Sequence, residues 1–272
     1  MPDTSLAHVL TPEGWALLNS LGPYLESESL KLNTELRKAG HSPELVAAVL
    51  TQARLRMKAR AKFGPFAEHM LFTPAGLEQA TRLNVAALHA QRYQEARLER
   101  VADLGCGIGA DSLALATLDR QVTAVELDEI TAAVATINLM PWPEAKVVQG
   151  DAESFDLTGF DGVWLDPARR TTSTSGTSRI FDPEAFSPPL SFVESLADRG
   201  MPVGVKLGPG IPHESVPAGC EVQWVSVGGD VIEATLWFNE LRRPGIRRAA
   251  LVIGPNGAAE LTSHEDYVPG AQ

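Results

Sequence analysis

Residues 101–111, with the sequence VADLGCGIGAD, constrain the fold more than any other part of the chain. The pattern predicts a short apolar strand that runs into a glycine-rich turn and then into a helix. Gly105 and Gly107 allow the backbone to turn tightly and to approach a ligand closely, because no side chain intervenes. Gly109 allows the helix to begin close to the sheet. The segment therefore predicts a strand–turn–helix unit that binds a ligand at the turn.

The chain beyond residue 100 alternates short apolar strands with helical segments. Strands are expected at 101–104, 122–127, 145–150, 162–166 and 202–207, and helices at about 110–118, 129–139 and 189–199. Such alternation predicts an α/β fold with a Rossmann-like, doubly wound and mostly parallel sheet. Later strand candidates have only short connections, so we expect antiparallel strands at the sheet edge; these candidates are 221–227, 231–238 and 249–254.

The first part of the chain is predicted to be helical. A threonine cap followed by proline starts a helix at 12–21, and Ser42-Pro43 starts another that continues through residue 62 until Gly64. A third helix is expected from about residue 74 to 97. We therefore divide the chain into a small all-helical N-terminal domain (1–73), an α/β domain (74–254) and a loosely held polar tail (255–272).

Carboxylates fall at the ends of the first four predicted strands. Asp103 precedes the first glycine of the turn by two residues, where it suits the ammonium of a methionine moiety and would repel a pyrophosphate. Glu126, Asp151 and Asp166 follow at the next three strand ends. Because parallel strands bind ligands in the crevice at their carboxyl ends, these acids are expected to converge on one site.

This series resembles the motifs of class I S-adenosylmethionine-dependent methyltransferases. The resemblance implies that Glu126 accepts hydrogen bonds from the ribose hydroxyls and that Asp151 and Ala152 contact the adenine. It also implies that Asp103 and the turn glycines bind S-adenosylmethionine; these glycines are Gly105, Gly107 and Gly109. A nicotinamide dinucleotide is the alternative cofactor, but the spacing is G-x-G-x-G instead of G-x-G-x-x-G.

The end of the fourth strand carries Asp166-Pro167-Ala168-Arg169. Many amino-directed members of the family have Asp/Asn-Pro-Pro-aromatic here, so the resemblance assigns Asp166 and Pro167 to catalysis. The second proline and the stacking aromatic residue are replaced by Ala168 and Arg169, which leaves the target atom open.

Arg169 and Arg170 are interpreted as substrate-binding, because a guanidinium can stack on a base or bind a phosphate. The alternative is that they pair with nearby acids such as Asp182 or Glu184. Residues 171–179 (TTSTSGTSR) suit either a lid over the substrate or an idle flexible loop. Lys206 could reach the same crevice, although a solvated surface lysine is the favoured interpretation.

Charge is distributed unevenly along the chain. Residues 1–98 hold 11 Lys and Arg against 9 Asp and Glu, whereas residues 99–272 hold 12 against 25. Arg54, Lys58 and Lys62 share one face of the predicted second helix by their spacing of four residues. A basic helix beside an acidic domain predicts contact with the phosphates of an RNA substrate, the alternative being a solvated helix face.

Two narrower resemblances bear on the substrate. The segment LFTPAGLEQAT (71–81) resembles the lead-in of trimethylguanosine synthase-like methyltransferases. Together with WLDPARR and VKLGPG, residues 45–254 resemble bacterial methyltransferases with a THUMP-like domain, of which the C-terminal module is expected to be absent here. THUMP domains bind RNA, so this resemblance implies RNA methylation, with transfer to a nitrogen as the predicted chemistry.

Composition excludes several other classes. No segment approaches the roughly 20 apolar residues of a spanning helix, and no secretory signal or zinc spacing is present, so we expect a cytoplasmic protein with no membrane or metal partner. The two cysteines are expected to be reduced, with Cys106 as a packing residue; the second is Cys220. The alternatives left open are a small-molecule or protein methyltransferase and a catalytically silent cofactor-binding protein, and the sequence does not predict the oligomeric state.

Overall fold

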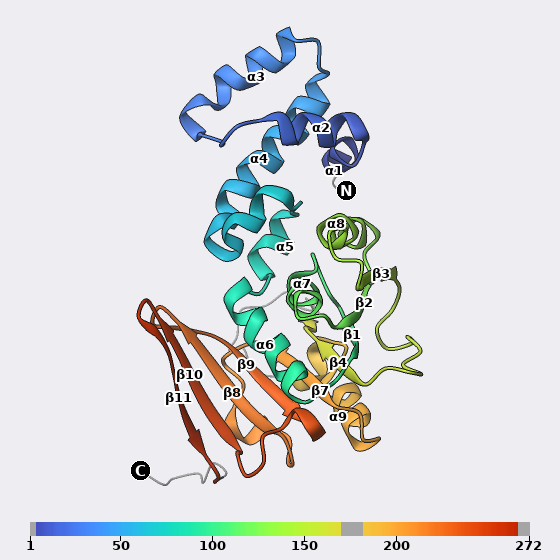
Figure 1. Ribbon diagram of the computed structural model, residues 1–272, viewed down its shortest axis with the longest axis vertical. Helices are drawn as coiled ribbons and strands as arrows, with labels where there is room; N and C mark the ends of the chain where they lie inside the picture. Colours follow the sequence, from blue (N-terminus) through green and yellow to red (C-terminus); the bar gives the residue numbers. More distant parts are fainter. Residues whose placement is uncertain (1–3, 170–181, 266–272) are drawn as a thin grey trace.

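The computed structural model describes residues 4–169 and 182–265 (Figure 1). Its α/β part is built on a nine-stranded sheet in the order β11-β10-β8-β9-β7-β4-β1-β2-β3. The parallel centre comprises β1 (Arg100–Leu104), β2 (Gln121–Glu126), β3 (Ala145–Gln149), β4 (Gly162–Leu165) and β7 (Val203–Leu207). These strands coincide with the predicted ones to within two residues, so the Rossmann-like α/β prediction is confirmed.

The remaining strands of this sheet extend it beyond β7. They are β8 (Glu221–Val227), β9 (Asp230–Phe238), β10 (Arg248–Gly254) and β11 (Gly257–Ser263). Strand β9 is antiparallel to β7 and to β8, as expected of edge strands. Strand β10, however, is parallel to β8.

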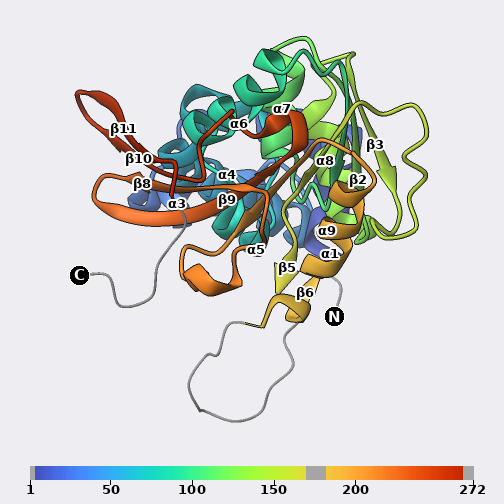
Figure 2. The same ribbon diagram turned by 90° about the horizontal axis from the view of Figure 1, so that it is seen from below.

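Helices cover both faces of the sheet (Figure 2). α6 (Leu83–Glu95), α7 (Ala110–Thr117) and α8 (Glu129–Leu139) lie on one face, and α9 (Leu190–Asp198) lies on the other. Successive residues of β1 show the alternation that makes this possible, because Val101 belongs to the same buried cluster as Tyr93 of α6, and Ala102 to the same cluster as Val193 of α9. Short elements complete the described chain: η3 (Pro183–Ala185), η4 (His213–Ser215), η5 (Asn239–Leu241), and the pair β5 (Ala168–Arg169) and β6 (Phe186–Ser187).

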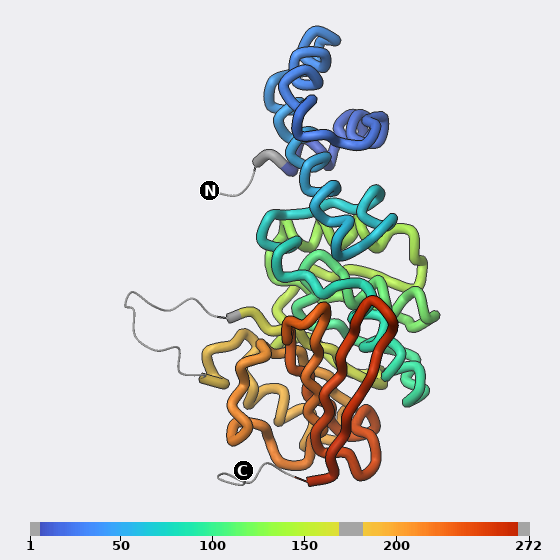
Figure 3. The backbone as a smooth tube through the Cα atoms, turned by 90° about the vertical axis from the view of Figure 1, so that its left-hand side faces the viewer, coloured from blue at the N-terminus to red at the C-terminus, as the bar shows by residue number. Residues whose placement is uncertain are grey.

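The N-terminal helices extend from one end of the molecule (Figure 3). They are α1 (Thr4–Val9), α2 (Pro12–Ser20), η1 (Glu26–Glu28), α3 (Ser29–Lys38), α4 (Pro43–Phe63) and η2 (Gly64–His69). The caps expected from the sequence are present: the Thr11 hydroxyl accepts a hydrogen bond from Gly14 N, and the Ser42 hydroxyl accepts one from Leu45 N. Among the described residues, no helix is both long and apolar enough to cross a membrane.

Two further expectations about the helices and strands were wrong. The helix expected at 74–97 is broken into α5 (Pro74–Gln79) and α6, because the backbone of Ala80 and of Arg82 is not helical (ψ of 138° and 139°); between them, the Thr81 hydroxyl donates a hydrogen bond to Asp111 Oδ2. The polar tail expected from residue 255 instead contains β11, which pairs antiparallel with β10 over seven residues. Its side chains are mostly exposed, so the apolar alternation that reveals a half-buried strand is missing.

Residues 70–72 connect the N-terminal helices to the α/β part. The Gln52 amide of α4 donates to Phe72 O (2.7 Å) and accepts from Phe72 N (3.0 Å). The Asn138 amide of α8 accepts from Leu71 N (2.7 Å) and donates to Leu71 O (3.0 Å) and to Ile108 O (2.9 Å). Two buried amides from opposite sides therefore hold this segment in place.

Candidate active site

The glycine-rich turn between β1 and α7 lies against the end of β4. Gly105 N and Cys106 N both donate to Val125 O, at 2.9 and 3.0 Å. Gly105 has a φ of +83°, and a Cβ there would lie 3.5 Å from the carbonyl oxygen of Asp166. Burial raises the pKa of the Cys106 thiol well above its usual value, in keeping with a packing role.

Glu126 ends β2 beside the same turn. Its Oε2 accepts a hydrogen bond from Gly107 N (3.0 Å) and its Oε1 accepts one from Asp128 N (2.9 Å). These two backbone donors fix the orientation of the carboxylate and bring it to the turn, as the motif order predicts.

Asp103 lies beneath the turn with only 1% of its surface exposed. Its Oδ2 accepts from the Ser112 hydroxyl (2.5 Å), whereas its Oδ1 is buried and has no hydrogen-bond partner within residues 4–169 and 182–265. Burial, together with the charge of Asp111, raises the pKa of Asp103 well above its ordinary value. A buried carboxylate oxygen without a donor fits a site for the ammonium group of a bound amino-acid moiety.

Asp151 follows β3 and is exposed, and its Oδ1 accepts from Glu153 N (3.1 Å). The next residue, Ala152, is half-buried and packs against the core on the α9 side of the sheet. The structure thus places both residues at the carboxyl end of β3, one strand further out than Glu126.

Asp166, at the end of β4, forms an ion pair with Lys206 of β7 through its Oδ2. The Lys206 side chain is only 13% exposed, and its Nζ also donates to the Thr81 hydroxyl (3.0 Å). Burial opposes the charge of Lys206, but Asp166 and Asp111 together raise the pKa of Lys206 above its usual value. Burial raises the pKa of Asp166, and Lys206 opposes this effect. The favoured interpretation of Lys206 as a solvated surface lysine was therefore wrong.

A buried polar network continues from Lys206 into the protein, and sequence reasoning missed it. The hydroxyl of Thr81 donates to Asp111, whose other oxygen lies 2.8 Å from His89 Nδ1. His89 Nε2 lies 2.7 Å from Glu233 Oε1. Burial disfavours the charged imidazole, but Glu233 and Asp111 outweigh it and raise the pKa of His89 to about 9. In the sequence, His89 looks like an ordinary polar residue of a helix. Its place in the network depends on contacts with Asp111 and Glu233, which are far from it along the chain.

A cavity of about 480 Å³ opens beside this ion pair, between α5 and the ends of β4, β7 and β9. Asp166, Pro167 and Lys206 line one part of it, and Thr81 and Arg82 line another. The cavity therefore places the predicted catalytic loop at a space large enough for a small substrate group.

The basic face of α4 is smaller than its sequence suggests. The Arg54 side chain is about half exposed, and its Nε lies 3.6 Å from Glu26 Oε2. Lys58 is exposed. Lys62 reaches the edge of the Asp166 cavity, but its ammonium donates to three carbonyl oxygens at the end of α5. Those carbonyls use all three donors of the ammonium. In the structure Lys62 therefore acts as a cap for α5.

Of the predicted arginine pair, Arg169 and Arg170, the structure describes only the backbone of Arg169. The backbone of Arg169 forms β5 and pairs with Phe186 of β6. Arg170 and residues 171–179, expected to form either a lid or an idle flexible loop, lie outside the described residues. In the described parts of the chain, no group of three His, Cys, Asp or Glu side chains has the arrangement of a metal site.

The parallel strands, the glycine turn after the first of them and the acids at successive strand ends define a class I methyltransferase fold. Residues 101–174 match the family described as "Methyltransferase domain", and residues 3–59 match a "Domain of unknown function (DUF8688)". The chain therefore carries a methyltransferase domain with the class I fold. No curated protein matches the sequence.

Solved structures share this fold. A protein from Porphyromonas gingivalis W83 described as a methyltransferase is 20% identical, with a TM-score of 0.60, over 89% of this chain and 66% of that one. This chain thus spans about two thirds of that protein's length. An RNA methyltransferase from Salinibacter ruber, in complex with S-adenosyl-L-homocysteine, is 16% identical over 58% of this chain and 92% of that one. Its TM-score is 0.39, and this likeness carries no argument about the substrate.

Proposed function

We propose that the protein transfers a methyl group from S-adenosylmethionine to a nitrogen of an RNA substrate. The observation that carries the proposal is the placement of Asp166. This carboxylate ends β4 beside the glycine turn, lines a cavity of about 480 Å³ and is ion-paired with Lys206. An ionised carboxylate at this point can accept a hydrogen bond from an amine that enters the cavity.

The cofactor would be held by the glycine turn, by Asp103 at its ammonium group and by Glu126 at its ribose, with Asp151 and Ala152 toward the adenine. When bound, it supplies a methyl group on a sulfonium, which is already electrophilic. The protein then has to align a nucleophile and to accommodate the positive charge and the proton of the attacking nitrogen.

Asp166 is suited to that task because its two oxygens are in different situations. Lys206 contacts Oδ2 and favours the ionised form, whereas Oδ1 has no partner within the described residues. We assign Oδ1 to the target amine: it would orient the nitrogen lone pair and stabilise the charge that develops on nitrogen. Pro167, which follows it, is buried and lines the same cavity.

The choice of RNA is supported by charge. The first 98 residues carry a small excess of positive charge, unlike the acidic remainder of the chain. Arg54 and Lys58 are exposed along α4, and Arg82 lines the Asp166 cavity together with Lys206. Positively charged side chains that extend from a helix to a reaction site can bind successive phosphates of a nucleic-acid backbone. Substrate binding by Arg169 and Arg170 stays a prediction from the sequence.

The test is transfer of tritiated methyl groups from S-adenosylmethionine into separated RNA, protein and small-molecule fractions of a cell extract. We expect label in RNA, and we expect Asp166→Ala to abolish transfer while it still binds the cofactor. Asp198→Asn, at an exposed carboxylate at the end of α9, is the matched control and should transfer normally. Label only in protein or in small molecules would contradict the RNA substrate, and full transfer by Asp166→Ala would remove Asp166 from catalysis.

RNA contact by α4 is tested separately. Reversing the charges of Arg54 and Lys58 to Glu should weaken RNA binding and reduce its dependence on salt concentration. RNA affinity that is unchanged at low salt would show that α4 is only a solvated helix face.

A further inference from the structure

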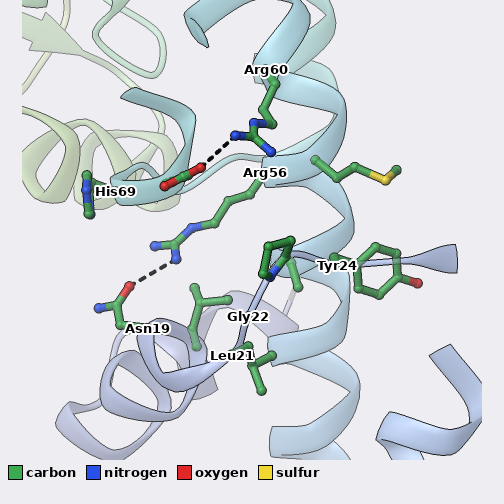
Figure 4. A pocket seen from close by; sticks show the side chains of 12 residues that line it. Asn19, Leu21, Gly22, Tyr24, Arg56, Arg60 and His69 are labelled. Atoms are coloured by element: carbon green, nitrogen blue, oxygen red, sulfur yellow. Dashed lines mark hydrogen bonds and ion pairs between the residues drawn. The ribbon is translucent and has the colours of Figure 1, made fainter. Parts of the chain in front are cut away.

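A second cavity lies in the N-terminal helical region, between α4 and the chain that follows α2 (Figure 4). Its volume is about 260 Å³, close to the lower end of the range for small-molecule pockets. Leu18, Ala53 and Met57 give it apolar walls, and Arg56 and Arg60 of α4 give it two guanidinium groups. The cavity thus combines an apolar body with a charged end.

Arg56 is the unusual member of this set, because only 9% of its surface is exposed. Its Nε donates to Met70 O (2.8 Å) and its Nη1 donates to Asn19 Oδ1 (3.0 Å). Its guanidinium also lies over the Trp15 ring, 5.3 Å from the centroid. Its Nη2 is buried and has no hydrogen-bond partner in the described part of the chain. Figure 4 shows the guanidinium extended from α4 across the cavity toward Asn19.

The charge of Arg56 is also left without a direct counterion. Within residues 4–169 and 182–265, no carboxylate lies within ion-pair distance of it, and the nearby Glu68 is paired with Arg60 at 2.9 Å. Burial lowers the pKa of Arg56 to about 10, with Glu68 opposing this effect, so the group is still protonated at neutral pH. A buried cation without a partner destabilises a protein, and an anion placed beside it would remove that cost.

This cavity is separate from the one at Asp166. Successive residues of an α-helix are about 100° apart around its axis, so Lys62 lies about 200° around α4 from Arg60. Arg60 lines the N-terminal cavity and Lys62 lines the edge of the Asp166 cavity. The two cavities therefore open on different sides of α4, and a ligand in the first is not the methyl acceptor in the second.

We propose that the N-terminal cavity is a binding site for a small organic anion. A carboxylate or phosphate group of the ligand accepts hydrogen bonds from Nη2 of Arg56, and an apolar body packs against Leu18, Ala53 and Met57. The Nη2 group of Arg56, which has no partner among the described residues, can donate to either acid group. The site is independent of methyl transfer, so it stands whether or not the substrate is RNA.

The test compares three probes that share one aromatic ring: benzoate, phenyl phosphate and the uncharged benzyl alcohol. Each is titrated into the full chain while the melting temperature and the ¹⁵N-detected Nε–H resonance of Arg56 are recorded. We expect at least one anion to raise the melting temperature in a saturable way and to shift the Arg56 resonance, because a ligand that binds only the folded state stabilises it. A response to phenyl phosphate alone would select phosphate, and a response to benzoate alone would select carboxylate.

Two variants and one control localise the site. Arg56→Met should weaken anion binding by about tenfold or more, as expected for loss of a charged hydrogen bond. Ala53→Leu fills the cavity while it leaves the bonds of Arg56 to Met70 and Asn19 intact, and it should also weaken binding. Arg37→Met removes the same charge from an exposed position on α3 and should bind normally.

Three results would overturn the proposal: no effect of either anion on the wild-type chain, an equal effect of benzyl alcohol, or an equal loss of binding in Arg37→Met. If Arg56→Met does not fold, the resonance of Arg56 in the wild-type chain and the Ala53→Leu variant still decide the question.

Discussion

Replacing His89 by Gln removes the charge at the centre of the buried network between α6, α7 and β9. In the folded protein, His89 lies 2.8 Å from Asp111 and 2.7 Å from Glu233, and its side chain is almost fully buried. Burial lowers the pKa of a histidine, but the two carboxylates reverse this and raise the pKa of His89 to about 9. The folded state therefore keeps a proton that the unfolded state releases near the ordinary histidine pKa of about 6.5.

The size of the effect follows from proton linkage. Between about pH 6.5 and pH 9 the folded state binds one more proton than the unfolded state, so stability falls as pH rises through this range. The shift of the His89 pKa from 6.5 to about 9 corresponds to a loss on the order of 3 kcal/mol. This contribution is fully present below pH 6.5 and is absent once pH exceeds the folded-state pKa.

The assay is urea unfolding of the wild-type chain and of His89→Gln across that pH range, because subtracting the two curves cancels the other titrating groups. We expect the wild type to lose its advantage over the variant as pH rises. A difference in unfolding free energy that stays constant with pH would show that His89 is neutral in the folded protein, and it would refute the reasoning.

Three further predictions concern other parts of the structure. Lys206→Met should shift the acid limb of the pH–rate profile upward, because Lys206 opposes the effect of burial on the pKa of Asp166; Lys206→Arg should retain the wild-type profile. Asn138→Leu should lower the free energy of unfolding by about 3 kcal/mol, since it leaves buried backbone groups of residues 71 and 108 unpaired; a urea midpoint equal to that of the wild type would contradict this. Asp103→Ala should weaken S-adenosylmethionine binding in a calorimetric titration, and an unchanged affinity would defeat its assignment to the ammonium.

Much of the fold could be predicted because short stretches of the sequence determine the elements concerned. An apolar run predicts the strand before Gly105, and the glycines, which have positive φ in the structure, predict the turn that leads into the helix after Gly109. Both signals depend only on neighbouring residues. The acid at each strand end then follows from chain order, because parallel strands end at one edge of the sheet. For the same reason, Glu126 and Asp166 were expected near the turn, and both lie there.

What was missed depends on residues that are far apart in the sequence. At the break between α5 and α6, Thr81 contacts Asp111, 30 residues away, and the polar strand β11 forms by pairing with β10. Alternating basic residues on α4 look equivalent in the sequence, yet Arg56 is buried while Arg54 is exposed. Neither periodicity nor composition separates them, because burial is decided by what packs against each face of the helix.

The two amides that hold residues 70–72 affect how the molecule can be divided. The apolar core that begins at Leu6 continues without interruption to Ile108 and Leu139 of the methyltransferase part, and it crosses the boundary that we drew after residue 73. We therefore propose that the helical region is not a detachable module. Cutting the chain there would leave an apolar face and the Asn138 amide in water, so the two halves should melt in one cooperative transition and should not be interchangeable with those of other methyltransferases.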